Sequence, residues 1–220
     1  MEDIEKLSAP ANLTALAYAS IKRHILEGKL RSDVRLTEEF FSRRLGISKS
    51  PIREALNGLQ NEGLIRIEPR RGAYLRTFSI KEVQDLYDLR ETLESYAVSV
   101  VRIDAQLIKE LRISIERTRQ FLNENDKIRH IEEDVRFHNR IASASENMEL
   151  CRVLETVQNQ IWLFRCQSYD LSSSSAPEAH TTILEALEQR DHTTAVSAMR
   201  THIDNVRGRL VDFLSNKTPG

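Results

Sequence analysis

The chain has 220 residues, of which 40% are hydrophobic and 30% are charged, and its net charge is −1. This length allows one or two domains with a proper core, and the composition is typical of a soluble protein. No run of about 18 apolar residues is present, which excludes a transmembrane helix. Because the acidic start lacks the apolar core of a signal peptide, and two cysteines fit a reducing compartment, we expect a cytoplasmic protein.

Basic side chains gather in one stretch of the sequence. Residues 43–77 hold eight basic and three acidic side chains, whereas residues 79–220 hold 18 basic and 23 acidic ones. A basic segment attached to an acidic body is typical of a module that binds a polyanion. The sequence therefore predicts a nucleic-acid-binding region joined to a second part with another task.

The first predicted elements in chain order are a polar arm over residues 1–11 and a helix in which apolar residues recur at helical spacing as far as Ile25. Two shorter helices follow. Thr37 can cap the first of them, and Gly46 can end it, because glycine takes a left-handed backbone without a Cβ penalty. Ser48 or Ser50 can cap the second, and Pro51 sits near its start, where a missing N–H does no harm. Two short helices joined by a tight turn predict a helix-turn-helix.

The second helix of this pair begins with hydroxyl and cationic side chains, which are the groups that reach phosphates and base edges. A short hairpin with arginines at its turn follows and predicts a wing. The residues expected to contact DNA are Arg43, Arg44, Ser48, Lys49, Ser50, Arg53, Arg70 and Arg71. Residues 12–78 therefore predict a winged helix-turn-helix, with three helices and a β-hairpin wing.

The rest of the chain predicts only helices. Ser79 and Glu82 form a capping-box pattern, and a second such pattern, Ser175 with Glu178, opens the fifth of six expected helices. Short polar breaks separate the helices. Residues 79–215 therefore predict an antiparallel helical bundle, and the chain as a whole predicts a mostly α fold.

Metal-ligating side chains recur on the apolar faces of three of these helices. Asp134 and His138 are four residues apart and share one helix face, while His180 and His202 lie on the fifth and last helices. One such histidine is more often a core residue than a ligand, but four inward-facing residues in a bundle predict a metal site. A carboxylate and three imidazoles suit Zn²⁺, Ni²⁺, Co²⁺ or Mn²⁺. We expect His130, one turn before Asp134, to be solvated.

Two arginines lie on the same apolar side as these ligands. A buried guanidinium such as that of Arg90 needs an anion, which is either Glu94 one turn on or the carboxylate of a ligand bound at the metal. Arg165 raises the same question. Arg90 and Arg165 are therefore candidates to bind an effector, and the sequence leaves the choice open.

With these residues laid out, the sequence resembles the GntR superfamily of bacterial transcription regulators. More narrowly, it looks like the FadR subfamily, in which a winged helix precedes an all-helical FCD effector domain. Six expected helices look more like its VanR branch. The motifs that carry the resemblance are Leu36-Thr37-Glu38, the run Leu45 to Leu56, Glu62-Gly63-Leu64, Arg70-Arg71-Gly72, and the set Asp134, His138, His180 and His202.

This resemblance implies a homodimeric, cytoplasmic DNA-binding regulator, most often a repressor, that reads a pseudo-palindromic operator. It also implies a divalent metal (Zn, Ni or Mn) in each bundle and a small organic acid as effector. The family's recognition-helix arginine falls on Arg53. Lys49 and Glu39 depart from the family pattern, since arginine and a basic residue are usual there.

Two alternatives to this interpretation stay open. An Asp/His₃ site with open positions can activate water, as in a metal-dependent hydrolase with a basic accessory domain, although no general base is evident beside the ligands. Within the regulator class, the chain could be a metal-free protein that responds to acyl-CoA. We expect a regulator and not an enzyme.

Overall fold

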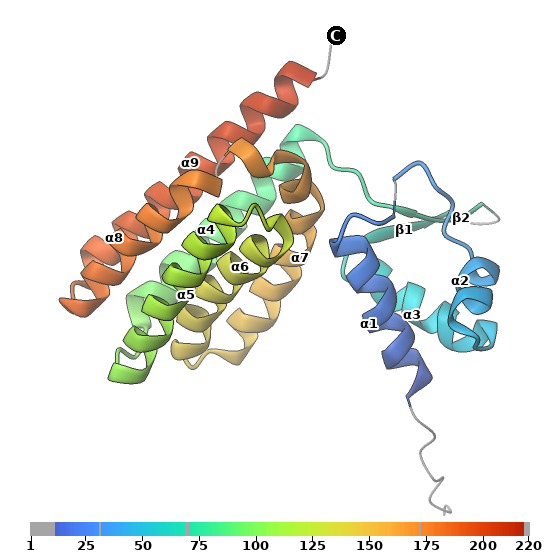
Figure 1. The fold of residues 1–220 in the computed structure, drawn as a ribbon, viewed down its shortest axis with the longest axis horizontal. Helices are drawn as coiled ribbons and strands as arrows, with labels where there is room; N and C mark the ends of the chain where they lie inside the picture. Colours follow the sequence, from blue (N-terminus) through green and yellow to red (C-terminus); the bar gives the residue numbers. More distant parts are fainter. Residues whose placement is uncertain (1–11, 31, 69–70, 172, 218–220) are drawn as a thin grey trace, which may run out of the picture. The chain divides into compact units, whose positions relative to one another are not determined.

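The computed structural model describes residues 12–30, 32–68, 71–171 and 173–217 (Figure 1). The chain divides into two compact units, Met1–Thr77 and Phe78–Gly220. Phe78, which was expected to end the first domain, packs edge-on against Phe164 in the second unit, with ring centroids 5.4 Å apart. No helix in the described part of the chain is long and apolar enough to span a membrane.

The first unit is a small helical core with a hairpin. Its elements are α1 (Leu13–Leu26), α2 (Glu38–Leu45), α3 (Lys49–Asn61), β1 (Ile65–Glu68) and β2 (Gly72–Leu75). Thr37 caps α2 by accepting the Phe40 N–H at 3.1 Å, and Gly46 ends it with φ +67°. Both caps are local, so the sequence predicted them correctly. Ile52 and Leu59 of α3 are fully buried and pack the helix into this core.

The hairpin forms the wing. Strands β1 and β2 pair antiparallel, with Ile65 opposite Leu75 and Glu68 opposite Gly72. An isolated bridge joins Leu36, just before α2, to Ala73. Because the hairpin is hydrogen-bonded to the segment that leads into α2, the wing and the helix-turn-helix form one unit.

The second unit is an all-helical bundle. Its elements are α4 (Ile80–Val100), α5 (Ala105–Asn123), α6 (Lys127–Ala144), α7 (Met148–Ser168), the 3₁₀ turns η1 (Tyr169–Leu171) and η2 (Ser173–Ser175), α8 (Ala176–Glu188) and α9 (His192–Lys217). Helix α4 packs along α9, α5 packs along α6 and α8, and α6 also contacts α4 and α7. The predicted fold class, a winged helix-turn-helix followed by a helical bundle, is confirmed.

The helix starts of the bundle follow the sequence with one exception. Ser79 and Glu82 form the expected capping box at α4, and Asp104 caps α5 by accepting the Leu107 N–H at 2.8 Å. The capping box predicted at Ser175 is wrong. Ser175 has helical backbone angles and makes no side-chain cap bond, because it already belongs to the 3₁₀ turn η2. A side-chain cap requires a non-helical N-cap residue.

Candidate metal centre and nucleic-acid interface

The exposed face of α3 carries a row of polar side chains. Lys49, Arg53 and Asn57 follow one another at four-residue spacing and are exposed, while Ile52, Leu56 and Leu59 face the core. The three polar residues line an open groove of about 470 Å³ between α2, α3 and the wing. Asn57 was not among the expected DNA contacts, although its spacing from Arg53 places it on the same face. An asparagine amide can bind adenine through two hydrogen bonds.

Acidic residues at the start of α2 hold the cations of this groove. Arg53 donates from Nε to Glu38 Oε1 at 2.7 Å and from Nη2 to Glu38 Oε2 at 2.9 Å. Lys49 forms an ion pair with Glu39, which also lies 3.2 Å from Arg43 Nε. The side-on edge of the Arg53 guanidinium is therefore occupied, while its end-on edge can still meet a base.

The other expected DNA contacts lie on α2, at the start of α3 and beside the wing turn. Arg43 and Arg44 are exposed in the last turn of α2, Ser48 is the N-cap residue of α3, and Ser50 is exposed in its first turn. Arg71 is exposed beside the wing turn, with Nη1 3.8 Å from Glu68 Oε2. Arg70 lies outside the described residues. Of the basic residues expected on α2 and α3, Lys49 and Arg53 line the groove, whereas Arg44 lines a separate pocket beside Phe40.

In the second unit, Asp134 and His138 of α6, His180 of α8 and His202 of α9 come together. Each offers a ligand atom within 4.8 Å of the others, and all four are buried. His180 Nε2 lies 3.5 Å from Asp134 Oδ1, and His138 Nε2 lies 4.0 Å from Asp134 Oδ2. These residues were expected to share a site, and the packing of α6, α8 and α9 brings them together.

The polar atoms of this cluster fit a cation. Asp134 Oδ1, both ring nitrogens of His180, His138 Nε2 and His202 Nε2 are buried without a hydrogen-bond partner among the described residues. Each such atom costs about 1–3 kcal/mol unless something binds it. A divalent ion would satisfy one oxygen and three nitrogens together. The residues present therefore fit the metal that the sequence predicted.

The charge states of the cluster suit metal ligands as well. Burial lowers the pKa of His180 and of His202 well below the usual value, so both rings are neutral and each keeps a lone pair. Burial alone would raise the pKa of Asp134, but the positive charge of Arg165 outweighs it and lowers that pKa well below its usual range. Neutral imidazoles and an ionised carboxylate are the forms that bind a metal.

The two arginines expected to bind an effector lie beside the cluster. Arg165 of α7 is 13% exposed, and its Nη2 lies 2.5 Å from Asp134 Oδ2. Arg90 of α4 is 1% exposed and donates from Nε to Glu94 Oε1 at 2.6 Å, whereas its Nη2 is buried without a hydrogen-bond partner in the described chain. The pairing of Arg90 with Glu94 was one of the two alternatives that the sequence left open.

His130 is not solvated, so that expectation is wrong. Its ring is 2% exposed and packs edge-on against Tyr169 of η1, at 5.2 Å between centroids. Burial lowers its pKa. The 3₁₀ segment after α7 covers the start of α6, and nothing in the sequence near His130 signals this. His130, Tyr169 and Arg165 line a cavity of about 20 Å³ next to Asp134 and His202, which is room for about one water molecule.

Glu94 makes a contact that the sequence did not predict. One of its oxygens accepts from Arg90, and the other, Oε2, contacts Nδ1 of His138. Burial alone would raise its pKa, but Arg90 and His138 lower that pKa to about 2. A signal for a buried Glu94 was present, because Glu94 lies one turn after Arg90 on the same stripe. Its contact with His138 depends on how α4 packs on α6.

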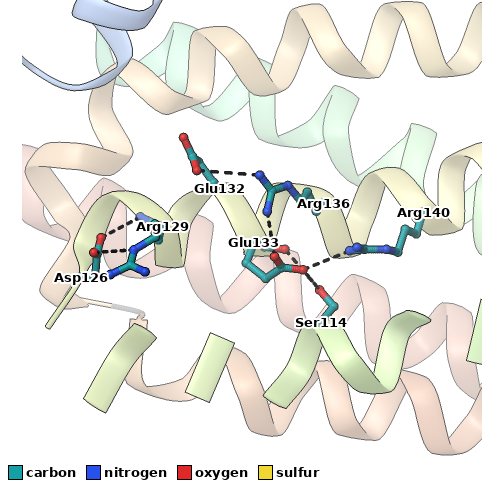
Figure 2. A network of polar contacts seen from close by, with 7 residues as sticks. All are labelled: Ser114, Asp126, Arg129, Glu132, Glu133, Arg136 and Arg140. Carbon is teal, nitrogen blue, oxygen red and sulfur yellow. Dashed lines mark hydrogen bonds and ion pairs between the residues drawn. The ribbon is translucent and has the colours of Figure 1, made fainter. Parts of the chain in front are cut away.

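A separate polar network holds α6 against α5 (Figure 2). Glu133 is fully buried and accepts hydrogen bonds from Ser114 Oγ of α5 at 2.7 Å, from Arg136 Nη1 at 3.0 Å and from Arg140 Nη1 at 3.1 Å. In Figure 2 the side chains of Arg136, Arg140 and Ser114 all converge on this carboxylate. The network touches none of the four candidate ligand side chains.

Two family models match the chain on either side of the junction between the units. The model described as "FCD domain" matches residues 85–205, more than half of the chain, and the model described as "Bacterial regulatory proteins, gntR family" matches residues 13–75. The chain belongs to the GntR family, with an FCD domain.

Relatives of this GntR-family regulator are similar over most of its length. The uncharacterized HTH-type transcriptional regulator YdhC of Bacillus subtilis is 27% identical over 210 residues, which covers 93% of each chain. The gluconate operon transcriptional repressor of the same organism is 26% identical, over 94% of this chain and 88% of its own. The solved structure of E. coli McbR/YncC superimposes with a TM-score of 0.81 at 20% identity, covering 92% and 98% of the two chains, and shows the shared fold.

Membership of the family decides between the classes of function considered for the sequence. GntR proteins are DNA-binding transcription regulators, and some of these relatives are named repressors. The hydrolase alternative is not favoured, because the family and the curated relatives named above are regulators. The protein is therefore a DNA-binding transcription regulator, and its FCD domain carries a buried Asp/His₃ group that fits a metal ion.

Proposed function

We propose that this GntR-family regulator is a homodimeric repressor controlled by a small carboxylate, which binds at a divalent metal in the FCD domain. Binding of the carboxylate either releases the repressor from its operator or strengthens its hold on it. The observation that carries the proposal is the buried Asp/His₃ cluster with its unpartnered polar atoms. In this assignment residues 12–78 bind DNA, residues 79–215 bind the effector and dimerise, and residues 1–11 are an arm. The protein acts in the cytoplasm.

Asp134, His138, His180 and His202 would hold the ion, which is Zn²⁺, Ni²⁺ or Mn²⁺. When bound, the ion supplies positive charge and open coordination positions for an oxyanion. If the ion is octahedral, these four side chains would leave two of its positions open to the effector. A carboxylate is the matching ligand class, because two guanidinium groups lie beside the cluster.

Arg165 and Arg90 are the residues assigned to pair with the carboxylate of the effector. Arg165 is the more accessible of the two and lines the small cavity next to Asp134 and His202. Arg90 offers its unpartnered Nη2. One relative is named for a gluconate operon, and gluconate is a carboxylate, which agrees with this ligand class.

On DNA, two copies would place two α3 helices in successive major grooves of a pseudo-palindrome, with the wing at the backbone. Arg43, Arg44, Ser48, Lys49, Ser50, Arg53, Arg70 and Arg71 are the assigned contacts, and Arg53 is the assigned base reader. In this proposal the dimer has two arrangements, one that binds the operator and one that does not. The effector changes DNA binding only if its affinity for these two arrangements differs.

A thermal-shift screen of organic acids tests the proposal. Protein purified without an affinity tag is loaded with Zn²⁺, Ni²⁺ or Mn²⁺ and melted with each acid, with and without a chelator. We expect one class of carboxylate to raise Tm only in the metal-loaded protein, and to change operator binding in a gel shift. The His138→Ala/His202→Ala variant is the control and should lose the response. An acid that stabilises equally after chelation would contradict the proposed site, and acyl-CoA binding by metal-free protein would favour the other kind of regulator.

A further inference from the structure

Two buried charged residues between α4 and α6 extend the candidate metal site. Arg90 and Glu94 are 1% and 2% exposed, and they are joined by the 2.6 Å hydrogen bond from Arg90 Nε to Glu94 Oε1. The second oxygen of Glu94 is turned away from Arg90 and contacts Nδ1 of His138. Arg90 therefore contacts Glu94, and Glu94 contacts His138, which is one of the four candidate ligands.

The chemistry of a histidine ligand gives this arrangement a purpose. A neutral imidazole carries one proton, and the group that faces one ring nitrogen decides which nitrogen keeps it. A carboxylate accepts a hydrogen bond and cannot donate one when ionised, so at Nδ1 it selects the Nδ1–H form. The lone pair is then on Nε2, the nitrogen that faces Asp134. Carboxylates that contact metal-binding histidines in this way orient the ring and raise its basicity.

We propose that Glu94 is a positioning residue of the metal site, which holds the His138 ring with the proton on Nδ1 and the lone pair of Nε2 directed at the ion, and that Arg90 holds Glu94 in place. This inference rests on the proposed metal site and adds two residues to it. A plain structural ion pair would need only Arg90 and Glu94, whereas here the second carboxylate oxygen is directed at a ligand ring from another helix.

The first measurement is the tautomer of His138 in metal-free protein. Long-range ¹H–¹⁵N spectra distinguish a protonated from an unprotonated ring nitrogen, and the His138 signals are those lost in His138→Gln. We expect a protonated Nδ1 in the wild type. The Arg90→Met/Glu94→Leu variant removes both charges together, which avoids leaving one charge buried alone, so it should fold. In this variant Nδ1 has no acceptor, and we expect a mixture of tautomers.

The second measurement is the dissociation constant for Zn²⁺, by competition with a chromophoric chelator at a temperature where every variant is folded. We expect affinity to fall about 10-fold to 100-fold in Arg90→Met/Glu94→Leu, and toward the lower end in Glu94→Gln, which keeps the shape of the side chain but not its charge. The control is Glu133→Gln, a buried carboxylate with arginine partners that touches no candidate ligand side chain. It should bind Zn²⁺ as the wild type does.

The outcomes separate this proposal from the function on which it rests. A wild-type protein that takes up no ion would refute the metal site and the role of Glu94 together. If the wild type binds the ion and the folded Glu94 variants bind it equally well, only the role of Glu94 is refuted. A wild-type His138 with its proton on Nε2 would also overturn the positioning role.

Discussion

Replacing Arg53 by alanine should weaken binding to the operator while leaving non-specific DNA binding nearly unchanged. Glu38 takes the Nε hydrogen and one Nη2 hydrogen of Arg53. Nη1 and the remaining Nη2 hydrogen form the end-on fork that matches O6 and N7 of guanine. Because the Glu38 contact fixes the plane of the guanidinium, the fork is preorganised for one base rather than free to follow phosphates.

The size of the effect follows from that geometry. One bidentate arginine–guanine pair contributes about 1–3 kcal/mol of discrimination, or roughly 5-fold to 150-fold in affinity. A dimer on two half-sites loses this twice, so we expect a total loss on the order of 2–6 kcal/mol. Removing a residue that reads a base should also leave the salt dependence of binding unchanged. Removing one phosphate contact, in contrast, lowers the slope of log K against log salt by about 0.9.

The assay is fluorescence anisotropy at several salt concentrations. The specific DNA is an operator obtained by selection from random sequences, and the non-specific DNA is a duplex of the same length. Lys49→Ala is the comparison for a phosphate contact, and Gln60→Ala is the matched control, an exposed residue of α3 outside the groove. Circular dichroism checks that each variant is folded.

The result that would refute this reasoning is an equal loss of specific and non-specific binding in Arg53→Ala, together with a lower salt slope. That pattern would make Arg53 a phosphate contact. Unchanged operator binding would remove Arg53 from the interface altogether.

Further predictions concern charge, metal, the helix turn and the buried network. Glu39→Gln should tighten non-specific DNA binding several-fold at low salt, because it frees Lys49 and Arg43, and the gain should vanish at high salt; weaker binding would contradict this. A metal ion at 100 times its Kd should raise the free energy of unfolding by about 2.7 kcal/mol. Calorimetry should show this as a Tm rise of roughly 5–11 °C that a chelator reverses. An unchanged Tm would argue against the metal site. Gly46→Ala should lower the free energy of unfolding in urea by about 1–2 kcal/mol. The cost comes from the backbone, because φ is +67° while an added Cβ would meet no atom within 4 Å. An unchanged free energy of unfolding would mean that the turn rearranges. Glu133→Gln should cost about 2 kcal/mol in the same assay, since it removes a charge-assisted acceptor; a stability equal to that of the wild type would refute this account of the network.

Local features of the fold were predictable because their physics is local. The caps at Thr37, Ser79 and Asp104 each join a side chain to a backbone N–H three residues on, so the sequence contains both partners. The cap expected at Ser175 failed for a reason that is not local to the motif. The preceding segment folds into a 3₁₀ turn, which gives Ser175 a helical backbone.

In the candidate metal site, too, local features were predictable from the sequence and contacts between helices were not. Helical spacing alone places Asp134 and His138 on one face, and apolar neighbours place His180 and His202 inward. Their meeting point needed the packing of α6, α8 and α9. His130 has a similar position on α6, yet its burial comes from Tyr169, 39 positions further along the chain.

The sequence by itself predicted the helices, the wing, the basic side chains of α2 and α3, and four inward-facing residues able to bind a metal, because side-chain type and spacing carry that information. Only the tertiary structure decided which charged side chains meet. It joined Arg53 to Glu38, Arg165 to Asp134, and Glu94 to both Arg90 and His138. Most of these contacts join residues on different helices, and no periodicity in one helix reports the register of its neighbour.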